Sequence, residues 1–137
     1  FLALEYRLCH AVHMLATPCL AWGNGLVMGA GMGLFSGASH RVVTAASRLA
    51  MPEIKIGLFP DCGATWFFNR LPPRLGLFVA LTGITLSPRD ALVAGLADRA
   101  IDHGAHAEVV EARSAGGNST PKTPPRPPRD PLHRAQA

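Results

Sequence analysis

The chain has 137 residues, which is enough for one domain and too few for two full ones. Its composition, 48% hydrophobic and 16% charged, excludes a globally disordered chain and a long coiled coil. The formal net charge is +4, but residues 1–113 carry 9 Lys and Arg against 8 Asp and Glu, whereas residues 114–137 carry 4 against 1. The basic excess belongs to the end of the chain and does not indicate binding to nucleic acid.

The first half of the chain alternates helical and strand patterns. Apolar side chains at helical spacing predict a helix over residues 2–16, which stops before Pro18 because proline disfavours a helical conformation in the residue before it. Residues 19–22 predict a short strand, and a second, glycine-rich helix is expected over residues 26–38. Residues 41–45 contain β-branched side chains and predict another strand.

The second half begins with a short apolar segment at residues 54–58, which a turn at 60–63 separates from two predicted helices, 64–70 and 73–82. The second of these helices offers four apolar side chains to the core, namely Leu75, Phe78, Val79 and Leu81.

The strongest local signal is the sequence Ser-Pro-Arg-Asp at residues 87–90. Serine at the N-cap, proline at the first position and an acidic residue two positions later predict the start of a helix, which Gly95 then ends. Residues 96–101 predict a short strand and residues 104–113 a last helix. The pattern as a whole indicates an α/β fold.

The composition changes abruptly after residue 113. Residues 114–137 hold six of the twelve prolines and almost no large apolar side chains, so they cannot bury enough surface to fold. We expect a domain over residues 1–113 and a disordered Pro/Arg-rich tail over 114–137. The sequence Pro-Pro-Arg-Pro-Pro in this tail suits an SH3- or WW-type groove, the alternative being an unstructured end.

The uncharged residues 19–38 are long enough to span a bilayer, but their six glycines and Asn24 fit a tightly packed soluble segment equally well. We therefore expect no membrane partner. The three cysteines form no CxxC pair and the six histidines lack metal-ligand spacing, so no metal or disulfide framework is expected.

Two features carry residues suited to chemistry. The glycine-rich bend at residues 23–33 fits a phosphate-binding loop, an oxyanion hole formed by backbone N–H groups at a helix start, or simple close packing. Glu53 and Asp61 each follow a proline in an apolar stretch. Burial raises the pKa of such carboxyl groups toward catalytic use, the alternative being two exposed turn residues.

Four segments in order resemble the crotonase, or enoyl-CoA hydratase/isomerase, superfamily. They are GNGLVMGAGMGLFSGASHRVV at 23–43, RLAMPEIKIGLFPDCGATWFFNRLP at 48–72, VALTG at 79–83 and AGLAD at 94–98. The resemblance is strongest to the 3-hydroxyisobutyryl-CoA hydrolase branch. It implies a partial crotonase-like ββα spiral and an acyl-CoA substrate, with hydrolysis of 3-hydroxyisobutyryl-CoA in valine breakdown as the activity. No cofactor is expected, since the coenzyme A that the resemblance implies is part of the substrate. The alternatives are another crotonase reaction, namely enoyl-CoA hydration or isomerisation, and a non-catalytic remnant.

The resemblance also implies roles for individual residues. The backbone N–H that binds the thioester oxygen falls on Ala30, within the turn formed with Gly29 and Gly31. Gly33 stands where hydratases have one catalytic glutamate, while Glu53 and Asp61 match the carboxylates of the hydrolase branch. Which of these two is the nucleophile or the base stays open.

The resemblance implies that the family's first oxyanion donor would lie in a glycine-rich segment before Phe1, and that a further helical region would follow Ile101. We therefore expect a fragment that is weakly active or inactive by itself, and a homo-oligomer in a longer form. The cysteine usage fits a reducing interior, cytoplasmic or, in a eukaryote, the mitochondrial matrix.

Overall fold

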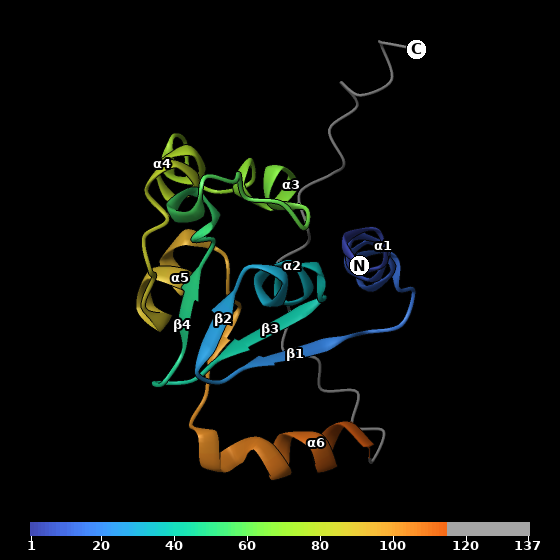
Figure 1. The fold of residues 1–137 in the computed structure, drawn as a ribbon. Coiled ribbons are helices and arrows are strands. Elements are labelled where there is room, and N and C mark those ends of the chain that lie inside the picture. Colours follow the sequence, from blue (N-terminus) through green and yellow to red (C-terminus); the bar gives the residue numbers. More distant parts are fainter. Residues whose placement is uncertain (115–137) are drawn as a thin grey trace.

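A computed structural model describes residues 1–114, in which two small parallel sheets are flanked by helices (Figure 1). The larger sheet has the strand order β1 (Leu20–Gly23), β3 (His40–Val43) and β5 (Arg99–Ala100). All its neighbours are parallel, with Leu20 opposite His40. Parallel strands cannot be joined by a tight turn, so the segments between these strands in the chain form crossover connections.

The smaller sheet pairs β2 (Leu26–Met28) with β4 (Arg48–Ala50), also in parallel. Leu49 adds an antiparallel bridge to Leu86, in which the two residues exchange both backbone hydrogen bonds, at 3.1 and 2.7 Å. Leu49 is fully buried. The bridge therefore attaches the segment that precedes α5 (Pro88–Ala94) to the middle of β4.

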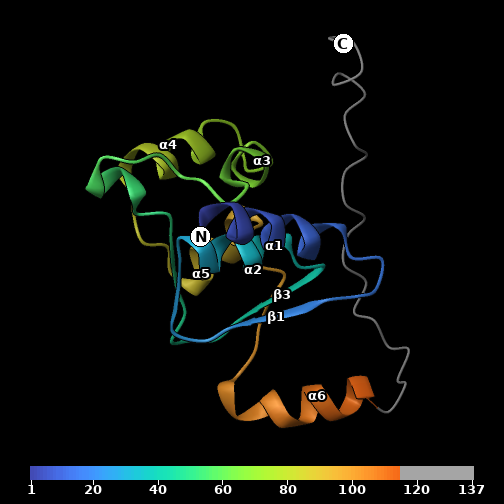
Figure 2. The same ribbon diagram turned by 45° about the vertical axis from the view of Figure 1, so that its right-hand side comes forward.

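Helices cover the two faces of the larger sheet. The first helix, α1 (Leu2–Met14), packs along α2 (Ala30–Gly37), and both lie on one side of β1 and β3 (Figures 1 and 2). The last helix, α6 (His106–Ser114), lies on the opposite side (Figures 1 and 2). There the ring of His106 makes an edge contact with Trp22 of β1, with the ring centroids 4.9 Å apart.

The remaining helices are short and follow β4 in the chain. They are η1 (Glu53–Ile56, a 3-10 turn), α3 (Ala64–Phe68), α4 (Leu75–Thr82), α5 (Pro88–Ala94) and η2 (His103–Ala105, a second 3-10 turn). Their ends are set by local chemistry, because Ser87 forms the predicted cap and Gly95 ends α5 in a left-handed conformation with φ 77°.

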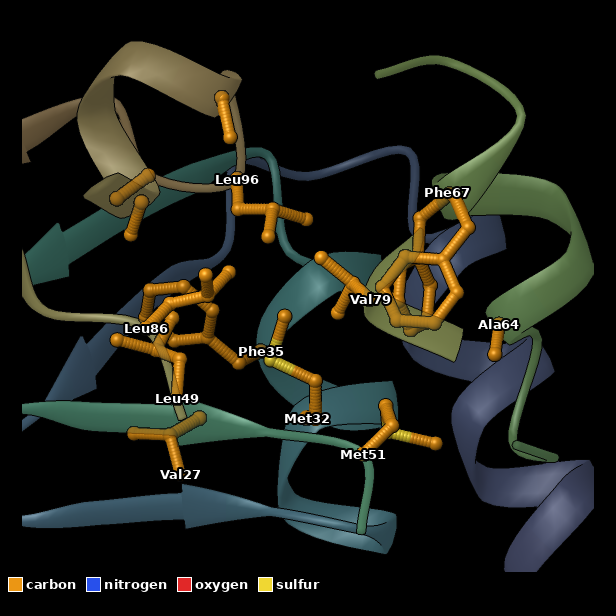
Figure 3. Packing of buried hydrophobic residues seen from close by; sticks show 14 of the residues in the cluster. Val27, Met32, Phe35, Leu49, Met51, Ala64, Phe67, Val79, Leu86 and Leu96 are labelled. Atoms are coloured by element: carbon orange, nitrogen blue, oxygen red, sulfur yellow. The ribbon is translucent and has the colours of Figure 1, made fainter. Parts of the chain in front are cut away.

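The core is one cluster of buried side chains that joins both sheets to α2, α3, α4 and α5 (Figure 3). Its fully or almost fully buried members include Met32, Leu49, Met51, Val79 and Leu96. Since these side chains come from four different segments, no pair of neighbouring elements forms a core alone.

Most predicted elements are confirmed, but β4 lies in a segment for which the sequence predicted no element, and other elements differ in their bounds or their buried side. The helix expected over 26–38 begins only at Ala30, because residues 26–28 pair with β4 as a strand. Residues 54–58, which the sequence marked only as a short apolar segment, are mostly a 3-10 turn that starts at Glu53. Phe78 and Leu81 are 52% and 62% exposed, so the prediction that they enter the core is wrong. The prediction is confirmed for Val79, which is buried, and for Leu75, which packs against the core, and Gly76 lies on the same side of α4.

No helix among the described residues is long and apolar enough to cross a membrane. The uncharged stretch 19–38 is divided among β1, β2 and α2. The tail predicted over residues 114–137 lies outside the described residues, except for Ser114, which ends α6.

Candidate active site

A tight strand-to-helix turn opens the site. Gly29 links β2 to α2 with φ 53° and ψ −125°, a conformation that favours glycine. Its N–H donates to the carbonyl of Ala50 (3.2 Å), and its own carbonyl accepts from Met32 (2.9 Å). The first backbone N–H groups of a helix have no acceptor within the helix. The N–H groups of Ala30 and Gly31 are therefore available at the N-terminal end of α2.

Glu53 lies directly beside this turn. It follows β4 through Met51 and Pro52, and it is the first residue of η1. A Cβ atom built on Gly29 would stand 3.1 Å from its Oε1 atom, so the carboxylate packs against the glycine. The other oxygen, Oε2, is buried and has no hydrogen-bond partner among the described residues. An unpartnered buried oxygen next to free N–H groups is a suitable place for a reacting group.

Burial raises the pKa of Glu53 above its ordinary value. A hydrogen bond from its own backbone N–H acts in the opposite direction, and the charge of Asp61 raises the pKa further. The two predicted carboxylates therefore interact through their charges. A carboxyl group with a raised pKa is a better base and proton donor near neutral pH.

Asp61 reaches this region from the turn between η1 and α3. It is half-buried, and its Oδ2 atom accepts a hydrogen bond of 2.7 Å from the hydroxyl of Tyr6 in α1. The next residue, Cys62, is buried and adopts a left-handed conformation with φ 47°. The turn thus joins Asp61 to α1 and packs Cys62 against Gly33 of α2.

A cavity of about 450 Å³ opens beside Asp61. Its walls come from α1, from the side of α2 that carries Gly33 and Ser36, and from residues 59–67. The lining is mainly apolar, with Phe59 and Trp66 among its aromatic members. Such a cavity suits an apolar or weakly polar group of modest size.

The predicted site residues therefore divide into two groups. Gly29, Ala30, Gly31 and Glu53 lie at the N-terminal end of α2 and are not among the residues that line the cavity, whereas Asp61 lines it. Gly33 packs against the turn at Cys62, which leaves no space for a larger side chain there.

Other candidate residues do not come together as a metal site. Among residues 1–114, no three His, Cys, Asp or Glu side chains are placed to hold a metal ion. The three cysteines are free thiols, with Cys9 and Cys62 buried. His13 packs its ring against Trp66 at a centroid distance of 4.3 Å.

Sequence reasoning missed Tyr6 and Ser36. Ser36 is 5% exposed and lines the cavity, and its hydroxyl has no hydrogen-bond partner among the described residues. The spacing of Tyr6, His10 and His13 places polar side chains on one side of α1, a signal that could have indicated a polar wall.

Comparisons with known proteins agree on one family. The family model described as enoyl-CoA hydratase/isomerase matches residues 1–125. A mitochondrial 3-hydroxyisobutyryl-CoA hydrolase from Bos taurus is 44% identical over 98 residues, which are 72% of this chain and 25% of that protein. The small ribosomal subunit protein mS47 from Neurospora crassa is 36% identical over 115 residues, covering 84% of this chain and 22% of that protein.

A solved structure gives the same result for the fold. An enoyl-CoA hydratase from Rhodobacter sphaeroides superposes with a TM-score of 0.81 and 34% identity, covering 96% of this chain and 39% of that one. The chain thus spans about a quarter of the length of the curated relatives described above.

Proposed function

Because this chain belongs to the enoyl-CoA hydratase/isomerase, or crotonase, family, we propose that it acts on acyl-CoA thioesters and hydrolyses them. The observation that carries the proposal is the contact between the Glu53 carboxylate and the Gly29 turn. It places a carboxylate of raised pKa beside backbone N–H groups at a helix start. Thioester hydrolysis needs both groups around one carbonyl.

In the proposed reaction, the thioester oxygen accepts a hydrogen bond from the N–H of Ala30. This donor stabilises the negative charge that develops on the oxygen, and one such donor contributes roughly 10²- to 10³-fold to the rate. The crotonase family usually has glycine at the position of Ala30. The methyl group of Ala30 leaves the backbone N–H in place. The end of α2 adds a favourable electrostatic potential for the same charge.

Glu53 then acts in one of two ways. As a nucleophile, its carboxylate attacks the carbonyl carbon, the C–S bond breaks, CoA leaves as a thiolate, and water hydrolyses the resulting anhydride. As a general base, it takes a proton from a water molecule whose oxygen attacks the same carbon, and the tetrahedral intermediate then breaks the C–S bond and releases CoA as a thiolate. In both routes, Asp61 positions water or a substituent of the acyl group from the cavity wall.

The acyl group proposed is 3-hydroxyisobutyryl, in valine breakdown. The name of the Bos taurus relative supports this choice, as does the retention of Glu53 and Asp61. The mitochondrial name of that relative also supports a mitochondrial matrix location in a eukaryote.

Hydration by a pair of glutamates is the weaker alternative, because Gly33 supplies no carboxylate. A non-catalytic role is the other alternative, and the ribosomal protein mS47 among the relatives favours it.

The test is release of free CoA thiol from acyl-CoA substrates, measured with a thiol-reactive chromophore under single-turnover conditions. We expect Glu53→Gln to lower the rate at least about a hundredfold. The matched control is Glu108→Gln, which removes an exposed carboxylate from α6. Equal rates for the wild-type chain and Glu53→Gln would overturn the assignment of Glu53. No thiol release from any substrate would favour the non-catalytic alternative.

A further inference from the structure

Two consecutive side chains of α1 reach the turn that carries Asp61. The hydroxyl of Tyr6 donates a hydrogen bond of 2.7 Å to Oδ2 of Asp61. The thiol of Cys62 donates to Oε1 of the neighbouring Glu5 at 3.8 Å. Both contacts join residues that are 55 or 57 positions apart in the chain. The turn is therefore attached to α1 by side chains, in addition to its packing on α2.

The backbone of this turn needs such support. Cys62 and Gly63 are consecutive residues with positive φ, at 47° and 85°. For a residue with a side chain, this conformation costs free energy and persists only where the surroundings impose it. The carbonyl of Asp61 accepts from the N–H of Ala64 (2.7 Å), which fixes the backbone but not the carboxylate. The orientation of the carboxylate depends on Tyr6.

In the hydrogen bond between Tyr6 and Asp61, the phenol is the donor and the carboxylate is the acceptor. The bond to Asp61 raises the pKa of Tyr6 to about 12, with smaller contributions from burial and from the charges of Asp61, Cys62 and Glu5. The phenol therefore stays protonated at neutral pH and always donates. The ionisable groups around the pair come from α1, η1 and the turn itself, namely Glu5, Cys9, His10, His13, Glu53 and Cys62.

We propose that Tyr6 is a positioning residue for Asp61, which holds Oδ2 of the carboxylate and so fixes how Asp61 faces the cavity. The inference rests on the proposed thioester hydrolysis for its functional meaning. Tyr6 itself also lines the cavity, so the pair forms one polar patch on a mainly apolar wall. An acyl group or water molecule entering the cavity meets a carboxylate whose orientation is already set.

The first experiment does not require turnover. Tyr6 is the only tyrosine in the chain, so absorbance of the phenolate reports on this residue alone. We expect the wild-type chain to titrate near pH 12 and Asp61→Asn to titrate near the ordinary value of about 10. At pH 11 the phenol would then be mostly protonated in the first protein and mostly ionised in the second. Glu108→Gln is the control and should behave as the wild type.

Circular dichroism at each pH confirms that the compared proteins are folded. A wild-type titration near pH 10, or an unchanged titration in Asp61→Asn, would overturn the inference. This result is independent of the proposed function, because it is obtained without substrate.

The second experiment compares Tyr6→Phe with the wild type in the thiol-release assay, run with excess substrate under steady-state conditions. Loss of the hydroxyl should lower kcat roughly three- to tenfold, with KM changed less than about twofold, because orientation is lost while the cavity keeps its shape. A general loss of structure would instead reduce the folded fraction and show in the thermal transition. An unchanged kcat in a folded Tyr6→Phe variant would overturn the inference. If neither protein released thiol, the proposed function would fail, while the tyrosine titration would still decide whether Tyr6 holds Asp61.

Discussion

Gly33 and Cys62 are in such close contact that a Cβ atom at position 33 would stand 2.5 Å from the Cβ of Cys62 and 2.7 Å from its carbonyl oxygen. The thiol of Cys9 would be 3.1 Å away. Glycine at this position therefore allows α1, α2 and the Asp61 turn to meet. The same contact explains why a second carboxylate cannot be added at position 33 without moving the turn.

We predict that Gly33→Ala destabilises the fold by about 1–3 kcal/mol, because the added methyl group overlaps backbone atoms that cannot move independently. Urea unfolding followed by circular dichroism measures the change. The control is Gly31→Ala in the same helix, since a Cβ there meets nothing within 4 Å. That variant should be as stable as the wild type or slightly more stable. Equal stability of both variants would contradict the prediction.

The raised pKa of Glu53 should make the stability of the fold depend on pH. The pKa of Glu53 is raised by burial in the folded chain, so the folded state holds this proton more tightly than the unfolded state. Stability is therefore lost as the pH rises through the interval above the ordinary value of 4.5. Glu53→Gln should be more stable than the wild type at pH 7, and the difference should vanish below pH 4.5. Chemical denaturation at several pH values measures it, and a variant less stable at pH 7 would refute the sign.

The end of the AGLAD segment serves stability. Oδ1 of Asp98 accepts from the guanidinium of Arg41 (2.7 Å), and Oδ2 accepts from Nε and from the backbone N–H of the same residue (3.1 and 2.7 Å). We predict that Asp98→Asn destabilises the fold by about 1–3 kcal/mol, because a charge-assisted bidentate contact is lost. Glu111→Gln, an exposed change on α6, should stay within about 0.5 kcal/mol in the same thermal or urea measurement.

The cap of α5 offers a separate test. The hydroxyl of Ser87 accepts from the N–H of Asp90 (3.2 Å), while Asp90 Oδ2 accepts from the N–H of Ser87 (3.0 Å). Ser87→Ala should cost about 0.5–2 kcal/mol, whereas Ser87→Thr, which keeps a hydroxyl, should cost less.

The same cap adds a pH dependence of opposite sign to that of Glu53. Hydrogen bonds from Ser87 lower the pKa of Asp90, so its contribution is present above 3.8 and is lost at lower pH. The gap between Ser87→Ala and the wild type should therefore narrow in acid, and a constant gap down to pH 2 would contradict this origin.

Local signals in the sequence were sufficient for part of the fold. The cap at Ser87 and the stop at Gly95 depend on neighbouring residues only, and the structure confirms both. The family resemblance predicted the crotonase-like fold, which the superposition on the hydratase confirms. The structure also explains the glycine that ends the VALTG segment. A Cβ atom at Gly83 would stand 3.1 Å from the side chain of Ile54 in η1.

Features that depend on distant contacts could not be predicted. Strand β4 is three residues long and becomes a strand through pairing with β2 and the bridge to Leu86. The exposure of Phe78 depends on which side of α4 meets the core, which periodicity alone does not decide. The bond between Tyr6 and Asp61 joins two residues that nothing local connects.

The three residue pairs between β2 and β4 set the geometry of the candidate site. The turn at Gly29 follows β2 and Glu53 follows β4, so the backbone pairing of these two strands determines the position of Glu53 relative to the turn. The smallest slip that keeps the same side chains facing inward is two residues, which would carry Glu53 about 7 Å along the sheet. The exposed side chains of the two strands, Leu26 and Arg48, can therefore change without moving the site, while an insertion or deletion within either strand separates the carboxylate from the helix end.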